Sequence, residues 1–135
     1  MAGPRYLLDT NIFIHAQRGH ANVLKRMRRA GQSNLVLSSL VAAELAYDVV
    51  KSTHKANNKA ALEALLSAFT VMPWEESAMW FYAENFHRLR SGGTPIGEMD
   101  LLIGCQALAL NATCVTNNTR EFERIEGLKL ENWVI

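Results

Sequence analysis

The sequence predicts an α/β protein of three layers, in which helices flank both faces of a small, mostly parallel central sheet. Short apolar runs of strand length alternate along the chain with longer segments whose apolar residues recur at helical spacing. Strands separated by helical segments favour parallel pairing, with helices packed on both faces of the sheet. The 135 residues are the usual size of one domain, and we expect a single domain over 1–135.

The first half of the chain is expected to begin with a strand at 5–9, an apolar run that ends in Asp9. Gly31 is a typical stop for the helix before it, and Ser38 or Ser39 can cap the helix that follows the second strand. The other elements expected here are helices at 11–17 and 20–30, a strand at 34–38, and helices at 40–51 and 55–68.

The second half is expected to start with a short strand ended by Pro73. The clearest loop of the sequence, Ser91-Gly92-Gly93-Thr94-Pro95, separates two helices. The expected elements are a strand at 69–72, helices at 75–90 and 98–111, a buried strand at 112–116, a polar segment at 117–126 and a last strand at 128–130.

The composition narrows the class of protein. Hydrophobic residues make up 49% of the chain and charged residues 20%, which excludes a disordered protein. The net charge is only +1, so nucleic-acid binding would depend on local patches. Cys105 and Cys114 have neither disulfide-framework nor zinc spacing and are expected in the core. With no secretory or membrane-spanning segment in view, we expect a cytoplasmic protein that does not bind membranes.

Four acidic residues stand apart from those on solvated helix faces. Asp9 ends the first strand, Asp100 opens an apolar helix, and each of the other two, Glu44 and Glu121, follows a predicted strand. Ligands of parallel sheets bind beyond the carboxyl ends of the strands, so these four should lie near one edge. Such carboxylates repel one another unless a cation lies between them, and Mg²⁺ or Mn²⁺ prefers oxygen ligands. An ion held there can activate water for phosphodiester hydrolysis.

Each acid also has an ordinary structural interpretation. Asp9 could simply cap a helix, and Asp100 could be favoured by the helix dipole at a first turn. Glu44 could lie on an exposed helix face, and Glu121 taken alone is typical of a surface residue. Their shared position at strand ends and helix openings favours a common site.

Four motifs give this chain a specific resemblance. They occur in order over nearly its whole length and are similar to those of PIN-domain nucleases, in particular the VapC toxins of bacterial type II toxin–antitoxin pairs. The motifs are YLLDTNIFI at 6–14, the segment 37–47 with LSSL and AELAY, GTPIGEMDLLI at 93–103, and VTNNTREFERI at 115–125 followed by GL at 127–128 and ENW at 131–133.

The resemblance implies a PIN-like fold and an Mg²⁺-dependent or Mn²⁺-dependent endoribonuclease that cleaves structured RNA, often tRNA. It also implies a homodimer in the bacterial cytoplasm that a VapB-type antitoxin inhibits. Carried over by position, the acidic site would comprise Asp9, Glu44, Asp100 and Glu121. We expect Asp9 and Asp100 to hold the main metal ion, Glu44 to hold or orient the attacking water, directly or through the metal, and Glu121 to complete a second, weaker metal position. The supporting polar residues would be Thr10, Asn11, Thr116 and Asn118.

The fourth acidic position departs from the commoner PIN pattern. Many PIN domains have an aspartate where this chain has Asn117 and Asn118, and the nearest acid is Glu121. Asn118 could coordinate a water instead, and Glu98 is a further candidate beside Asp100. Candidate RNA contacts form the densest local group of cations, which comprises Lys25, Arg26, Arg28 and Arg29.

Two other functions fit parts of the sequence. A phosphatase that uses an aspartate nucleophile could also begin with a strand followed by Asp-Thr-Asn. Such enzymes need a second aspartate two residues on, and Asn11 stands there. A binding module that has lost catalysis is the non-enzymatic alternative, and the retained Asp9, Glu44 and Asp100 argue against it.

Overall fold

The computed structural model describes residues 3–135, and their strands form one parallel sheet. The strands are β1 (Tyr6–Leu8), β2 (Leu35–Ser38), β3 (Val71–Met72), β4 (Thr113–Val115) and β5 (Leu130–Glu131). They lie in the order β3-β2-β1-β4-β5, and each neighbouring pair is parallel. The expected three-layer α/β/α class, with a small parallel sheet between helices, is therefore confirmed.

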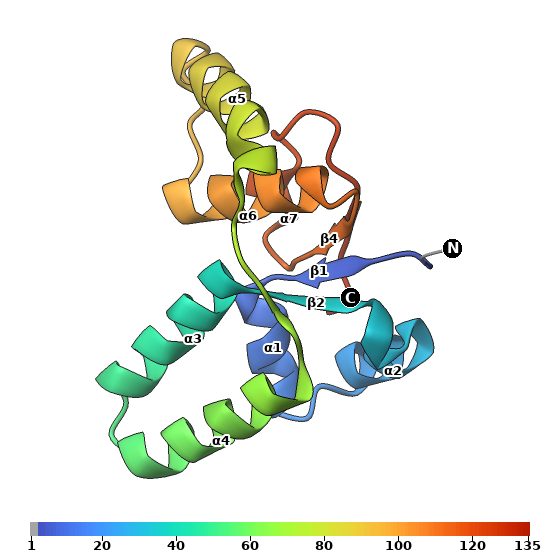
Figure 1. Cartoon of the computed structure of the whole chain (residues 1–135), viewed down its shortest axis with the longest axis vertical. Coiled ribbons are helices and arrows are strands. Elements are labelled where there is room, and N and C mark those ends of the chain that lie inside the picture. The colour runs from blue at the N-terminus through green and yellow to red at the C-terminus, as the bar shows by residue number, and fades with distance from the viewer. Residues whose placement is uncertain (1–2) are drawn as a thin grey trace.

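Helices cover both faces of this sheet. They are α1 (Thr10–Gln17), α2 (Ala21–Ala30), α3 (Ser39–Lys51), α4 (Lys55–Ala68), α5 (Met79–Ser91), α6 (Glu98–Ala109) and the short α7 (Thr119–Phe122). Figure 1 shows α1 to α4 on one side of the strands and α5 to α7 on the other. No helix within residues 3–135 is long and apolar enough to cross a membrane.

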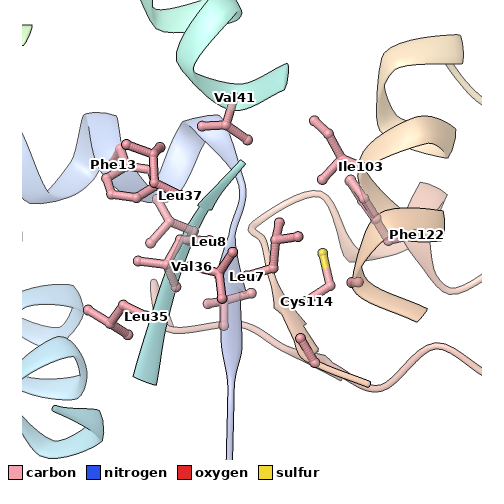
Figure 2. Packing of buried hydrophobic residues seen from close by; sticks show 14 of the residues in the cluster. Leu7, Leu8, Phe13, Leu35, Val36, Leu37, Val41, Ile103, Cys114 and Phe122 are labelled. Carbon is pink, nitrogen blue, oxygen red and sulfur yellow. The ribbon is translucent and has the colours of Figure 1, made fainter. Parts of the chain in front are cut away.

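The core lies on both faces of β1, β2 and β4. Figure 2 shows side chains of these strands packed between Phe13 of α1 and, on the opposite side, Ile103 of α6 and Phe122 of α7. Leu7 and Leu8 of β1 are both fully buried, as expected for a central parallel strand. Cys105 and Cys114 are buried free thiols, in agreement with the sequence prediction.

The chain changes direction across the sheet at β1. It runs from β1 to β2 and β3 on one side and then returns to β4 and β5 on the other, so β2 and β4 flank β1. The carboxyl ends of β1 and β4 therefore border the crevice where parallel α/β sheets bind ligands. Asp9 follows β1 and Thr116 follows β4 at this edge.

Most expected elements form, with shifted ends. The helix expected at 55–68 is confirmed, and Ser38 caps α3 by accepting from the Leu40 amide. The helix expected from residue 75 begins only at Met79, after a 3₁₀ turn at Glu76–Ala78. The short N-terminal tail before residue 3 falls within the expected domain but outside the described residues.

Two expectations for the C-terminal part were wrong. The segment 117–126 was described only as polar, with no helix predicted in it, but Thr119–Phe122 forms α7. The last strand was expected at 128–130, but it is Leu130–Glu131. Gly127 has a positive φ of 81°, and the Leu128 amide donates back to the Ile125 carbonyl, so the chain is still turning at residue 128.

Candidate active site

Asp9 lies at the centre of the candidate site and is only 4% exposed. Its backbone amide still pairs with the Val115 carbonyl of β4, and its side chain caps α1. The Thr10 amide donates to Asp9 Oδ1 at 2.8 Å. Asp9 therefore does cap a helix, as one interpretation of the sequence held, but capping uses only one of its two carboxylate oxygens.

The second oxygen of Asp9 is held by side chains from two elements. Thr116 Oγ1 donates to Asp9 Oδ2 at 2.8 Å, and Asn11 Nδ2 donates to the same atom at 3.0 Å. Thr116 is fully buried, and its hydroxyl in turn accepts a hydrogen bond from the main-chain N–H of Asn118 at 3.0 Å. Hydrogen bonds to a carboxylate fix its orientation and favour its charged form.

Glu44 reaches the same region from α3. Thr10 Oγ1 donates to Glu44 Oε1 at 2.6 Å, which links the first turn of α1 to the second turn of α3. Glu44 is half-buried, so its carboxylate lies at the edge of the site rather than on a fully solvated helix face. Thr10 therefore joins two of the four acids, because its amide binds Asp9 and its hydroxyl binds Glu44.

Asp100 and Glu121 are bridged by one amide group. Asn118 Nδ2 donates to Asp100 Oδ2 at 3.2 Å and to Glu121 Oε2 at 3.1 Å. Asp100 lies in the first turn of α6 and Glu121 lies in α7, so the bridge connects two helices on one face of the sheet. Asn118, at the position where the sequence departs from the expected carboxylate, holds two carboxylates in place.

The electrostatics of the site match crowded, partly buried acids. Burial raises the pKa of Asp9, although the Thr116 hydroxyl and the Thr10 amide act in the opposite direction. The pKa of Asp100 is raised to about 7 by burial, by a hydrogen bond shared with Glu121, and by the charges of Asp9, Glu121 and Glu44. The same shared hydrogen bond lowers the pKa of Glu121. The shared proton therefore resides on Asp100, and a cation would displace it.

The donor set fits a hard divalent cation. Carboxylates with neutral hydroxyl and amide groups around them are the oxygen-rich surroundings that Mg²⁺ and Mn²⁺ prefer. Within residues 3–135, no three acidic, histidine or cysteine side chains already converge at metal-binding distance. An ion that keeps several of its waters does not need such convergence, because it is bound through only one or two carboxylates directly.

Other predicted residues lie outside this cluster. Glu98 is exposed, and neither the hydrogen bonds nor the charges acting on Asp100 involve it, which favours Glu121 and Asn118 for the fourth position. Arg26 pairs with Glu131 at 2.9 Å and lies over the Trp133 ring, so its guanidinium is already engaged. The other three cations of α2, namely Lys25, Arg28 and Arg29, are exposed.

Sequence reasoning missed two contributors. The backbone amide of Gly97 hydrogen-bonds the Glu121 carboxylate and helps to lower its pKa. The Asn117 amide donates to Asn11 Oδ1 at 3.0 Å, which orients the Asn11 side chain toward Asp9. Both are main-chain donors, and no side-chain motif signals the position of a main-chain amide.

Comparison with known families and proteins finds a matching family model and relatives that are similar over nearly the whole chain. Residues 6–128 match the PIN domain. Ribonuclease VapC2 of Rickettsia felis is 41% identical over 132 residues, which cover 95% of this chain and 97% of that protein. The tRNA(fMet)-specific endonuclease VapC of Shigella flexneri is 32% identical, over 96% of this chain and 98% of that protein.

Solved structures show the same likeness. The crystal structure of VapBC2 from Rickettsia felis, bound to a DNA fragment from its promoter, contains a chain with a TM-score of 0.87 and 39% identity. The match covers 95% of the present chain and 98% of that one. A chain in the structure of DNA-bound VapBC from Salmonella typhimurium has a TM-score of 0.89 and 30% identity, over 97% and 99% of the two chains.

Proposed function

The chain belongs to the PIN-domain family as a VapC ribonuclease, the toxin of a toxin–antitoxin pair, and we propose that its acidic cluster binds Mg²⁺ to cleave RNA. The observation that carries the proposal is the environment of Asp9, a 4% exposed carboxylate held by three donors beside the acids of α3, α6 and α7. Burying that charge is unfavourable without a compensating cation.

The residues of the chain divide the work by position. Asp9 and Asp100 are the proposed ligands of the main metal ion, which could also be Mn²⁺. When bound, such an ion lowers the pKa of water and stabilises charge on the phosphate. Glu44 at the edge of the site orients the attacking water. Glu121 completes a second metal-binding position, which is weaker than the first. Thr116, with Thr10, Asn11 and Asn118, holds these carboxylates in place.

The substrate and partners follow from the relatives. Because a relative over nearly the whole chain is a tRNA(fMet)-specific endonuclease, we propose tRNA as the substrate. Solved relatives are VapBC complexes, so a VapB-type antitoxin is the proposed inhibitor. We further propose that 1–135 is one PIN domain that forms a homodimer and acts in the bacterial cytoplasm. The candidate RNA contacts are the exposed cations of α2, namely Lys25, Arg28 and Arg29. Arg26 adds positive charge to the same helix, although its guanidinium is paired with Glu131.

The two alternatives are weaker on structural grounds. A phosphatase with Asp9 as nucleophile would need an acid at residue 11, but Asn11 donates to Asp9 and would not transfer a proton. A non-catalytic binding module would not require the hydrogen bonds by which Thr10 and Thr116 hold the carboxylates of Asp9 and Glu44 in place.

The test is RNA cleavage by the purified protein with Mg²⁺ and with a chelator. We expect cleavage with Mg²⁺, none with the chelator, and none from Asp9→Asn although that variant stays folded by circular dichroism. Asp48→Asn is a matched control, because Asp48 lies on α3 and pairs with Lys51 outside the cluster. Cleavage by Asp9→Asn at the wild-type rate would disprove the site. Cleavage of small phosphate esters but not RNA would favour the phosphatase.

A further inference from the structure

A cavity of about 290 Å³ lies between the end of α5 and the start of α6. Its lining includes Phe86, Leu89, Arg90, Ile96, Glu98 and Leu101. In Figure 1 the loop from α5 leads directly into the first turn of α6, the turn that carries Asp100. Glu98 and Asp100 are two residues apart on α6, so their side chains point to nearly opposite sides of the helix. The cavity still lies near the acidic cluster, because its lining residue Ile96 adjoins Gly97, at which a Cβ atom would lie 3.8 Å from Asp100 Oδ2.

The walls of this cavity combine an apolar floor with a planar cation at the rim. Leu89 and Leu101 are 3% and 2% exposed and form the floor. The Arg90 guanidinium lies 5.8 Å from the centre of the Phe86 ring, and Arg90 is exposed. Aromatic rings and guanidinium planes are the side chains on which proteins stack unpaired bases of RNA.

The loop that closes the cavity is tied to the acidic cluster. Arg124 Nη1 donates to the Pro95 carbonyl at 3.1 Å, and the charge of Arg124 also acts on Glu121. The main-chain amide of Gly97 helps to lower the pKa of Glu121, and the Thr94 amide donates to the Leu89 carbonyl at 2.9 Å. The loop that lines the cavity is therefore linked to Glu121 of the acidic cluster.

We propose that this cavity binds one unstacked base of the RNA, close to the phosphate that is cleaved. The proposal rests on the ribonuclease function given above and adds a binding subsite to it. A base fits the surroundings better than a phosphate does, because the floor is apolar and the negative charge of the Glu98 carboxylate repels phosphate. Arg90 covers the inserted base, and Glu98 accepts from its exocyclic amino group.

The test measures base insertion separately from cleavage. Short single-stranded RNAs carry 2-aminopurine at each position in turn, and the fluorescence of this base falls when it stacks. Binding is measured on an Asp100→Asn background so that the RNA stays intact. Two substitutions alter the cavity. Arg90→Lys keeps the positive charge but removes the planar guanidinium group, and Ile96→Trp fills the cavity with a larger side chain. Arg18→Lys, at an exposed arginine that follows α1, is the matched control.

One probe position should be quenched by the background protein and by Arg18→Lys, but not by either cavity variant. Loss of the stacked base should weaken binding about fivefold to thirtyfold. An RNA with an abasic nucleotide at that position should bind all variants equally. Equal quenching by the cavity variants would overturn the proposal. So would undiminished binding of the abasic RNA, or a cavity variant that alters only dimer or antitoxin assembly.

Failure of the ribonuclease function would be seen separately. If the wild-type protein cleaves no RNA with Mg²⁺ but the quenching depends on the cavity as predicted, the base site stands and the catalytic proposal falls. If cleavage depends on Mg²⁺ and no position is quenched, the catalytic proposal stands and the base site falls.

Discussion

Replacing Asp100 with asparagine should stabilise the folded protein in the absence of divalent cations. The amide is a close match to the protonated carboxyl, because its oxygen can accept from Asn118 and its NH₂ group can donate to Glu121. The wild-type protein must instead keep an ionised Asp100 beside other negative charges at alkaline pH. The variant removes that repulsion without removing a hydrogen bond.

The magnitude follows from the pKa of Asp100, which is raised from 3.8 to about 7. A difference of about three units corresponds to a ceiling of about 4 kcal/mol. Asp100 is half-exposed, so solvent screens part of this energy, and the lowered pKa of its partner Glu121 offsets another part. We therefore expect Asp100→Asn to raise the free energy of unfolding by about 1–2 kcal/mol at pH 8.

The sign of the pH dependence is fixed by the raised pKa. Below pH 3.8 Asp100 is protonated in both the folded and unfolded states and has no unfavourable charge. As the pH rises toward 7, the unfolded state ionises first, and the folded wild-type protein loses relative stability. The advantage of the variant should therefore be small near pH 4, grow between about pH 4 and pH 7, and be nearly complete at pH 8.

The assay is thermal and urea denaturation in a chelator from pH 4 to pH 8. The expected advantage corresponds to a rise in Tm of about 3–8 °C at pH 8. Asp48→Asn, whose carboxylate pairs with Lys51 at the surface, should change stability by less than about 0.5 kcal/mol. An Asp100→Asn variant that is no more stable than wild type at pH 8 would refute the account of a repulsive cluster.

Three further changes test other parts of the structure. Thr116→Val removes the buried hydroxyl that donates to Asp9, and should lower stability by about 1–3 kcal/mol in urea denaturation and cleavage about 10-fold to 100-fold; wild-type cleavage rates would contradict this. Gln106→Leu leaves the Ser38 hydroxyl and the carbonyls of Met72 and Pro73 without their partner, and should cost about 2–3 kcal/mol while cleavage per folded molecule is unchanged. Neutralising the exposed cations of α2 together should weaken RNA binding and flatten its salt dependence, measured by titration at several salt concentrations; an unchanged slope would place the RNA elsewhere. These cations are Lys25, Arg28 and Arg29.

The fold was largely predictable because local pattern and tertiary packing agree. The apolar run before Asp9 is long enough for a buried strand only, and 55–68 has a helical pattern along its whole length. The predicted and observed elements differ where the conformation of the main chain, rather than the apolar pattern, determines where an element begins. The turn at Gly127 delays β5 by two residues, and Thr119–Phe122 forms one short helical turn within a polar segment that has no apolar repeat.

The candidate site was predictable in its acids and less so in its connections. The rule for parallel sheets places Asp9, Glu44, Asp100 and Glu121 at one edge, and they do lie around one hydrogen-bonded network. Their catalytic roles stay predictions. The double bridge from Asn118 could not be foreseen, because it depends on the relative positions of α6 and α7.

Metal binding by the acidic cluster is tested most directly by titrating Mn²⁺ into the metal-free protein in a calorimeter. The wild-type protein should bind the ion, with proton release near pH 7 as Asp100 gives up its proton. Asp9→Asn should lose most of this binding, whereas Asp48→Asn should bind like wild type. Equal Mn²⁺ binding by the wild-type and Asp9→Asn proteins would contradict the account.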